Sequence, residues 1–154
     1  MAEATSVLIR PRRADEGARL KEIAVASKGH WGYEQERVQQ WADHGDFSPK
    51  RLTELVVFVA ELGRSVGWSS LIRHGETAWL EDLWVEPGWI GQGIGGALFG
   101  HTAAHARTLG AKRLEWEAEP NAMGFYEKMG AKHIRESQSA WGRTLSVMAV
   151  ELDG

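Results

Sequence analysis

The segment that most limits how this chain can fold is a glycine-rich turn between a predicted strand and a predicted helix. Its centre is Gly91, Gln92, Gly93, Ile94, Gly95 and Gly96. Glycine permits positive φ and lets the main chain approach a ligand closely. The first-turn N–H groups of a helix lack partners within the helix, and the helix dipole favours an anion at that end. The turn therefore predicts a site for a phosphate or pyrophosphate group.

The spacing of apolar residues predicts the element order β-α-α-β-β-β-α-β-α-β-β. Apolar runs at 52–62, 65–73 and 77–87 indicate an antiparallel meander, because the turns between them are too short for parallel crossovers. Residues 46–51 are predicted to form a loop. The expected fold class is α/β (α+β), with one mixed, mostly antiparallel sheet of about seven strands flanked by helices. The remaining strands are expected at 6–13, 113–119, 131–137 and 144–152, and the helices at about 15–28, 33–44, 93–109 and 121–129.

Composition places the chain among ordinary globular proteins, with 43% apolar and 25% charged residues in 154. This length predicts a single domain, residues 1–154, with a core of its own. The formal net charge of -3 disfavours nucleic acid as the main partner. Because there is no cysteine, disulfides, thiolate metal ligands and a cysteine nucleophile are excluded.

The N-terminal residues carry no signal-peptide pattern, because only the short apolar run 7–9 precedes a cluster of arginines. No stretch reaches the roughly 20 apolar residues of a membrane-spanning helix. We therefore expect a cytoplasmic protein without a membrane partner. The sequence is compatible with a homodimer and does not specify the oligomeric state.

Two families share the spacing of the glycine-rich turn. Residues 91–96 match the G-x-G-x-x-G of dinucleotide-binding folds, and Glu115 or Glu117 lies about 20 residues further on. Such folds, however, begin with a parallel βαβ unit, whereas here three meander strands precede the turn. A nicotinamide-dependent oxidoreductase is thus the weaker alternative.

The same turn resembles the GCN5-related N-acetyltransferases when its flanks are included. Leu83-Trp84-Val85 precedes it, and Phe125-Tyr126-Glu127-Lys128 lies in a later segment similar to that family's second motif. The resemblance covers nearly the whole chain in element order, and it is specific in residues 83–98 and 119–131. In the frame that we prefer, which ends on Gly93 and Gly95, Ile90 stands where the family carries arginine or glutamine, and we expect it to pack. A frame on Gln92, Gly95 and Ala97 restores the letters but not the usual distance from the strand. Glu119 stands where many members carry asparagine, which leaves Asn121 as the candidate for that cofactor contact.

The resemblance implies an enzyme that moves the acetyl group of acetyl-CoA directly to an amine of a small molecule or peptide. It implies that the main chain of Leu83 and Val85 binds the pantetheine arm, and that Tyr126 protonates the departing thiolate. The alternative for Tyr126 is an aromatic residue packed at the start of a helix. The alternative for the whole chain is a CoA-binding domain without catalysis, which acts as a sensor or interaction module.

A carboxylate is the expected acceptor of the amine proton, because primary amines are mostly protonated at neutral pH. Glu81 and Asp82 lie on the strand before the turn, and Glu115, Glu117 and Glu119 lie on the next strand. Strand alternation puts Glu81 and Asp82 on opposite faces. We favour Asp82, while each carboxylate taken singly is also compatible with a solvated surface position.

The connection between the first two helices carries His30, Trp31 and Tyr33 beside two glycines. In the family this region forms part of the acceptor-binding wall, and rigid aromatic side chains suit recognition. The competing interpretation is a helix junction packed by Trp31. His101 and His105 are one helical turn apart, but they lack the glutamate and third ligand of a zinc hydrolase, so we predict no metal.

Overall fold

The computed structural model describes residues 7–30, 33–138 and 144–152, and its elements follow the predicted order with one addition. The addition is a third helix before the meander. Two short 3-10 helices, Pro87–Trp89 and Pro120–Ala122, precede α4 and α5. The strands and helices are β1 (Leu8–Pro11), α1 (Gly17–His30), α2 (Gln35–His44), α3 (Pro49–Glu54), β2 (Val56–Glu61), β3 (Ser65–His74), β4 (Thr77–Val85), α4 (Ile94–Thr108), β5 (Arg113–Ala118), α5 (Met123–Lys128), β6 (Lys132–Gln138) and β7 (Thr144–Glu151).

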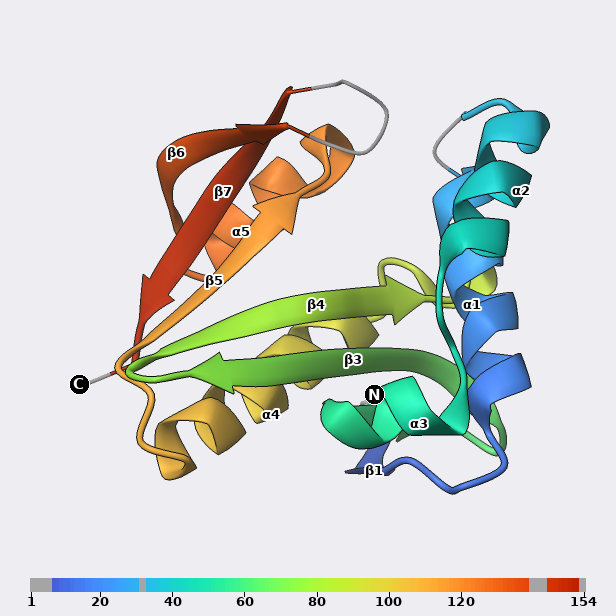
Figure 1. Cartoon of the computed structure of the whole chain (residues 1–154), viewed down its shortest axis with the longest axis horizontal. Helices are drawn as coiled ribbons and strands as arrows, with labels where there is room; N and C mark the ends of the chain where they lie inside the picture. Colours follow the sequence, from blue (N-terminus) through green and yellow to red (C-terminus); the bar gives the residue numbers. More distant parts are fainter. Residues whose placement is uncertain (1–6, 31–32, 139–143, 153–154) are drawn as a thin grey trace, which may run out of the picture. The chain divides into compact units, whose positions relative to one another are not determined.

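The strands form one seven-stranded sheet in the order β1-β2-β3-β4-β5-β7-β6 (Figure 1). Pairing is antiparallel between β1 and β2, between β5 and β7, and between β6 and β7. It is parallel where Thr77–Trp79 of β4 faces Arg113–Glu115 of β5. The predicted fold class, a mixed and mostly antiparallel sheet with flanking helices, is confirmed.

The helix α3 corrects the expectation of a loop at 46–51 and a strand from residue 52. Ser48 caps it, since the Ser48 Oγ accepts a hydrogen bond from the Arg51 N–H over 3.2 Å, and Pro49 occupies the first turn. Proline suits that position because its φ is already helical and its missing N–H would have no partner there. Leu52 of α3 is buried, and so is Leu55, the extended residue directly after the helix. The sequence interpretation failed because these leucines run directly into the apolar strand β2.

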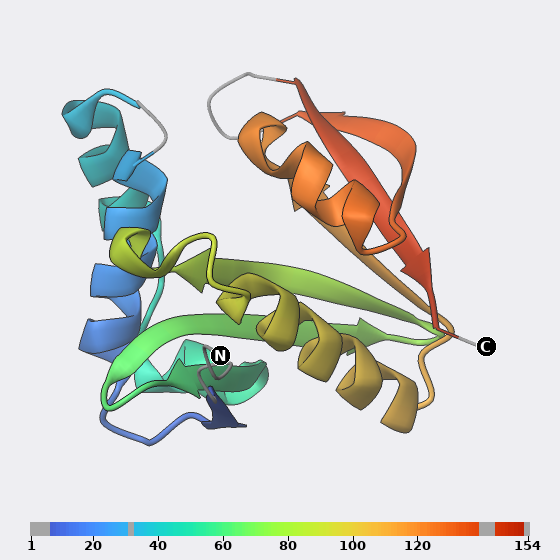
Figure 2. The same ribbon diagram turned by 180° about the vertical axis from the view of Figure 1, so that it is seen from behind.

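The chain divides into two compact units, of which the first comprises Met1–Ser70 and Asp82–Thr102. In this unit Ile94 and Leu98 of α4 pack on the core that Phe58 and Val66 help to form. Figure 2 shows α4 lying across β3 and β4. The close approach requires Gly67, because a Cβ there would lie 2.9 Å from the Trp84 carbonyl oxygen and 3.1 Å from Leu98 Cδ1.

The second unit comprises Leu71–Glu81 and Ala103–Gly154. Its core is built from β5 and β7, where Leu114, Trp116, Val147 and Met148 are each no more than 1% exposed. Trp116 of β5 lies opposite Met148 of β7, so each strand contributes a large side chain to this core. Tyr126 of α5 packs against Trp116, with ring centroids 4.8 Å apart.

Candidate functional site

The glycine-rich turn has the main-chain geometry that its sequence predicts. Gly91 and Gly93 adopt φ of +86° and +84°, a region that side chains other than glycine rarely adopt. The Gly93 carbonyl oxygen accepts the first helical hydrogen bond, from the Ala97 N–H over 3.0 Å. The N–H groups of residues 94–96 are therefore the first-turn donors of α4, which have no carbonyl partner within the helix.

The surface of the turn is open on the side where glycine lacks a side chain. A Cβ placed on Gly91, Gly93 or Gly96 would meet no other atom within 4 Å. Buried Ile94, 2% exposed, anchors the start of α4 to the core. Open main chain, first-turn donors and a fixed helix end fit a pyrophosphate group.

Gln92 and Ile90, which lie beside the glycines, both have exposed side chains. Gln92 is exposed, and its Nε2 lies 3.4 Å from the Gly88 carbonyl oxygen, to which it donates. Ile90 is 36% exposed, so the expectation that it packs is wrong. The turn offers its main chain to a ligand, and Ile90 adds an apolar side chain to the exposed surface.

Leu83 and Val85 lie in the last part of β4. Their side chains pack against the core beneath α4. The strand is tied to β3 just beyond Val85, where the Glu86 N–H donates to the Val66 carbonyl oxygen over 2.8 Å. This anchoring holds the strand that leads into the turn, and any role of these two residues in cofactor binding would belong to their main chain.

Asp82 is held by two hydrogen-bond donors within the first unit. The Ser70 hydroxyl donates to Oδ2 over 2.6 Å, and the Trp84 indole N–H donates to Oδ1 over 3.0 Å. Burial raises the pKa of Asp82, while the two hydrogen bonds and the positive charge of Arg51 act in the opposite direction. Glu81, the neighbouring candidate, is exposed. Asp82 is thus a fixed carboxylate whose pKa is shifted toward neutrality.

An aromatic cluster surrounds the side chain of Lys28, near the end of α1. The Lys28 Nζ lies 5.1 Å from the ring centroid of Tyr33, 4.9 Å from that of Trp41 and 5.8 Å from that of Trp84. Lys28 is only 6% exposed, and the rings of Trp41 and Trp84 meet edge to face. Of the predicted acceptor-wall residues, Tyr33 belongs to this cluster.

The other two acceptor-wall predictions fare differently. His30 is exposed at the end of α1, and Trp31 lies outside the described residues. The sequence interpretation overlooked Lys28, Trp41 and Trp84. Lys28 lies two residues before His30 in the sequence, next to the predicted acceptor wall. Trp41 and Trp84 are brought next to Lys28 only by folding of the chain.

Tyr126 lies at the centre of an aromatic group in the second unit. Its side chain is 7% exposed and contacts the rings of Trp116 and Phe125. Burial raises the pKa of Tyr126, and the negative charge of Glu119 raises it further. The phenol therefore keeps its proton throughout the neutral range. Asn121, the predicted cofactor contact, is exposed in the 3-10 helix before α5.

The carboxylates of β5 have different surroundings. Glu115 is buried, and its carboxylate pairs with Arg135 at 2.9 Å and with Arg113 at 3.7 Å. Both of its oxygens thus contact arginine, which indicates a structural role in joining β5 to β6. Glu117 is exposed.

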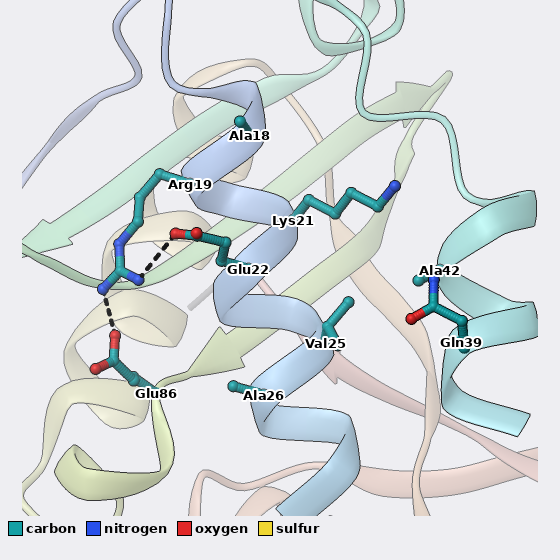
Figure 3. Close-up of a pocket in the computed structure, with 9 residues that line it drawn as sticks. All are labelled: Ala18, Arg19, Lys21, Glu22, Val25, Ala26, Gln39, Ala42 and Glu86. Carbon is teal, nitrogen blue, oxygen red and sulfur yellow. Dashed lines mark hydrogen bonds and ion pairs between the residues drawn. The ribbon is translucent and has the colours of Figure 1, made fainter. Parts of the chain in front are cut away.

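A separate hollow of about 650 Å³ lies along α1 and α2 in the first unit (Figure 3). Figure 3 shows Arg19 contacting both Glu22 and Glu86 at one side of it. Lys21 extends toward the side on which Gln39 lies. None of the predicted site residues lines this hollow.

The described residues form no evident metal site and no membrane-spanning helix. His101 contacts the Phe58 ring edge to face at 4.4 Å. Over residues 7–30, 33–138 and 144–152, no group of three or more His, Cys, Asp or Glu side chains is arranged to bind a metal. In the same part of the chain, no helix has the length and apolar character needed to cross a bilayer.

The fold and the turn define the class of protein: an α/β protein with a seven-stranded mixed sheet and a candidate main-chain anion site at the start of α4. The sequence model described as the acetyltransferase (GNAT) family matches residues 18–131. The chain belongs to that family. A search of curated proteins finds no match.

Solved structures of this fold cover almost the whole chain. A GCN5-related N-acetyltransferase from Rhodopseudomonas palustris is 25% identical, with a TM-score of 0.84 and 99% of each chain covered. The PaiA N-acetyltransferase from Thermoplasma acidophilum, solved with coenzyme A, is 18% identical, with a TM-score of 0.80 over 95% of this chain and 99% of that one. The yncA protein from Salmonella typhimurium, solved with its cofactor acetyl-CoA, is 20% identical, with a TM-score of 0.70 over 97% and 95%.

Proposed function

We propose that this protein transfers the acetyl group of acetyl-CoA directly to the amine of a small molecule or peptide. The observation that carries the proposal is the open turn at Gly91–Gly96, in a chain that belongs to an acetyltransferase family. The similarity to structures solved with coenzyme A or acetyl-CoA supports the same ligand. The family model identifies the domain but no particular substrate, so the class of acceptor is itself part of the proposal.

The cofactor residues in this proposal are mostly main-chain groups. The N–H groups of residues 94–96 and the adjoining glycines would bind pyrophosphate, and Gln92 would border the site. The main chain of Leu83 and Val85 would bind the pantetheine arm, and Asn121 is the remaining candidate contact. When bound, acetyl-CoA supplies a thioester carbonyl that an amine nitrogen can attack.

In this proposal Asp82 accepts a proton and Tyr126 donates one. Asp82 accepts a proton from the incoming ammonium, directly or through water, and its raised pKa makes it a stronger base for this step. Tyr126 donates a hydrogen bond or a proton to the sulfur as the carbon–sulfur bond breaks. Since its raised pKa keeps the phenol neutral, the donor is present at every working pH. His30, Trp31 and Tyr33 are proposed to contact the acceptor.

The test of the cofactor site is coenzyme A binding by paired glycine variants of α4. Coenzyme A at 100 times its dissociation constant should stabilise the wild-type fold by about 2.7 kcal/mol. Gly95→Val places bulk beside the first-turn donors and should abolish this ligand-induced stabilisation. Gly100→Val is the matched control, because it lies in the same helix and a Cβ there meets no other atom within 4 Å.

Thermal unfolding with and without coenzyme A measures both variants against their own ligand-free states. Equal stabilisation of wild type, Gly95→Val and Gly100→Val would place the cofactor elsewhere. NAD should produce no stabilisation, and a shift with NAD alone would favour the dinucleotide-binding alternative. Thiol release from acetyl-CoA across a panel of amines, amino acids and peptides then separates an enzyme from a catalytically silent CoA-binding domain.

A further inference from the structure

The Lys28 cluster and the Asp82 carboxylate share one side chain, the indole of Trp84. The Lys28 ammonium lies 5.8 Å from the Trp84 ring centroid, and the Nε1–H of the same ring donates to Asp82 Oδ1 over 3.0 Å. Asp82 and Trp84 are two residues apart on β4, so strand geometry places them on one face. The two interactions therefore act on the same indole, one on its ring system and one on its N–H.

The indole is well restrained. Trp41 meets it edge to face at 5.3 Å, and the Lys28 ammonium also lies over Trp41 and Tyr33. A cation near an aromatic ring is attracted by the electrons of its face, and burial strengthens the attraction. Lys28 is 6% exposed, so little water screens this interaction. Removal of the charge would release a restraint on the indole orientation.

A cation near the ring also makes the indole N–H a stronger donor, because it draws electron density from the ring. A stronger donor favours the ionised form of the carboxylate that accepts it. The other groups facing Asp82 are the Ser70 hydroxyl of β3, which does not titrate, and Arg51 of α3. Lys28 therefore adds to Arg51 in favouring ionised Asp82, although it acts through Trp84.

We infer that Lys28 is a positioning residue that orients the Trp84 indole and polarises its N–H, and that it thereby sets the protonation equilibrium of Asp82. The lysine acts through the tryptophan and need not touch any substrate. The role of Asp82 as acceptor of the amine proton rests on the proposed function, whereas the effect of Lys28 on Asp82 does not. The coupling of Lys28, Trp84 and Asp82 is a property of the ligand-free protein and can be measured there.

The experiment is an NMR titration of the full chain labelled with ¹⁵N-tryptophan, without acetyl-CoA or acceptor. The indole resonance of Trp84 is assigned by its loss in Trp84→Phe, and it should follow the ionisation of Asp82 as pH changes. In Asp82→Asn this titration should disappear. In Lys28→Met the midpoint should rise by about half a pH unit or more, because the ionised carboxylate loses support.

Lys28→Met suits this purpose because methionine is unbranched, similar in length and compatible with aromatic neighbours, so the cluster stays filled while the charge is lost. Lys28→Arg is the conservative control, since it keeps a cation that interacts with aromatic rings, and its midpoint should stay close to that of wild type. Thermal unfolding establishes that each variant is folded before it is titrated.

The contrary outcomes are distinct. A lower melting temperature in Lys28→Met with an unchanged Trp84 midpoint means that the lysine only stabilises the fold, and it overturns the inference. So does an equal rise in Lys28→Arg and Lys28→Met, because the charge would then not be the cause. A raised midpoint in a protein that acetylates no amine upholds the coupling and rejects the proposed function instead.

Discussion

At the scale of single residues, burial controls the protonation of the two side chains proposed for proton transfer. Burial raises the pKa of Asp82 and so makes it a stronger base, and two hydrogen bonds keep its orientation fixed. Burial raises the pKa of Tyr126 so that the phenol stays neutral. The same physical cause thus makes the Asp82 carboxylate a stronger base and keeps the Tyr126 phenol in its protonated form.

Replacement of Tyr126 by phenylalanine tests the donor. The ring and its contacts with Trp116 and Phe125 remain, so stability and acetyl-CoA affinity should change little. The kcat should fall by about 100-fold, because general acid catalysis typically contributes 10² to 10⁴. Steady-state kinetics with chemistry shown to be rate-limiting provides the measurement.

Two controls sharpen this comparison. Phe125→Leu disturbs the neighbouring aromatic contact without removing a proton, so its kcat should stay near that of wild type. An acetyl thioester with a more acidic thiol should narrow the deficit of Tyr126→Phe, because its thiolate needs less protonation. If the kcat of Tyr126→Phe lies within twofold of the wild-type value, Tyr126 has a packing role and is not the proton donor.

At the scale of elements, the short helix α3 connects local sequence to the environment of Asp82. It begins at a serine cap, and its residue Arg51 contributes the positive charge that favours ionised Asp82. Buried Leu52 of α3 and buried Leu55, directly after the helix, join it to the core. A six-residue helix has little stability of its own, so the cap and these contacts determine whether it persists.

Ser48→Ala should therefore lower the free energy of unfolding by about 1 kcal/mol, because the Arg51 N–H loses its acceptor. Ser48→Thr, which retains a hydroxyl cap, should lose much less. Urea denaturation measures both variants. Equal stabilities for wild type and Ser48→Ala would mean that water replaces the cap without cost.

At the scale of the whole molecule, a network of ion pairs and hydrogen bonds around Glu16 joins the three strands β1, β2 and β3 and makes stability depend on pH. Arg10 of β1 donates to both oxygens of Glu16, at 2.9 and 2.7 Å, and to Glu61 of β2 at 3.0 Å. Glu16, just before α1, also accepts from the Ser65 hydroxyl of β3. The hydrogen bond from Arg10 is the main cause that lowers the pKa of Glu16 from 4.5 to about 2.

A carboxyl group with a lowered pKa in the folded state stabilises the protein above its unfolded pKa, and that stability is lost as pH falls. The free energy of unfolding should therefore decrease by about 1 to 2 kcal/mol between pH 5 and pH 2, after allowance for solvent screening. Glu16→Gln should be less stable at pH 7 and should show a shallower acid decline. Urea midpoints across this range provide the measurement, and parallel pH curves for the two proteins would exclude Glu16 as the cause.

Features that depend on neighbouring residues could be predicted from the amino-acid sequence. Strand and helix periods repeat over a few positions, so the element order and the sheet class could be read from apolar spacing. The turn at Gly91–Gly96 was equally accessible, because its φ values and helix-end donors are properties of the local main chain. Helix α3 is the exception. Leu52 and Leu55 directly precede the apolar strand β2, so their positions fit either a helix or a longer strand.

Which side chains contact one another became evident only from the folded chain. Lys28, Trp41 and Trp84 are far apart in sequence, and no local pattern relates them, yet their contacts surround the indole that holds Asp82. Glu115 and Asp82 look alike as strand carboxylates, but folding pairs one with arginines and gives the other two neutral donors. Such differences arise from burial and long-range contacts, which form only when the chain has folded and which single-chain periodicity does not encode.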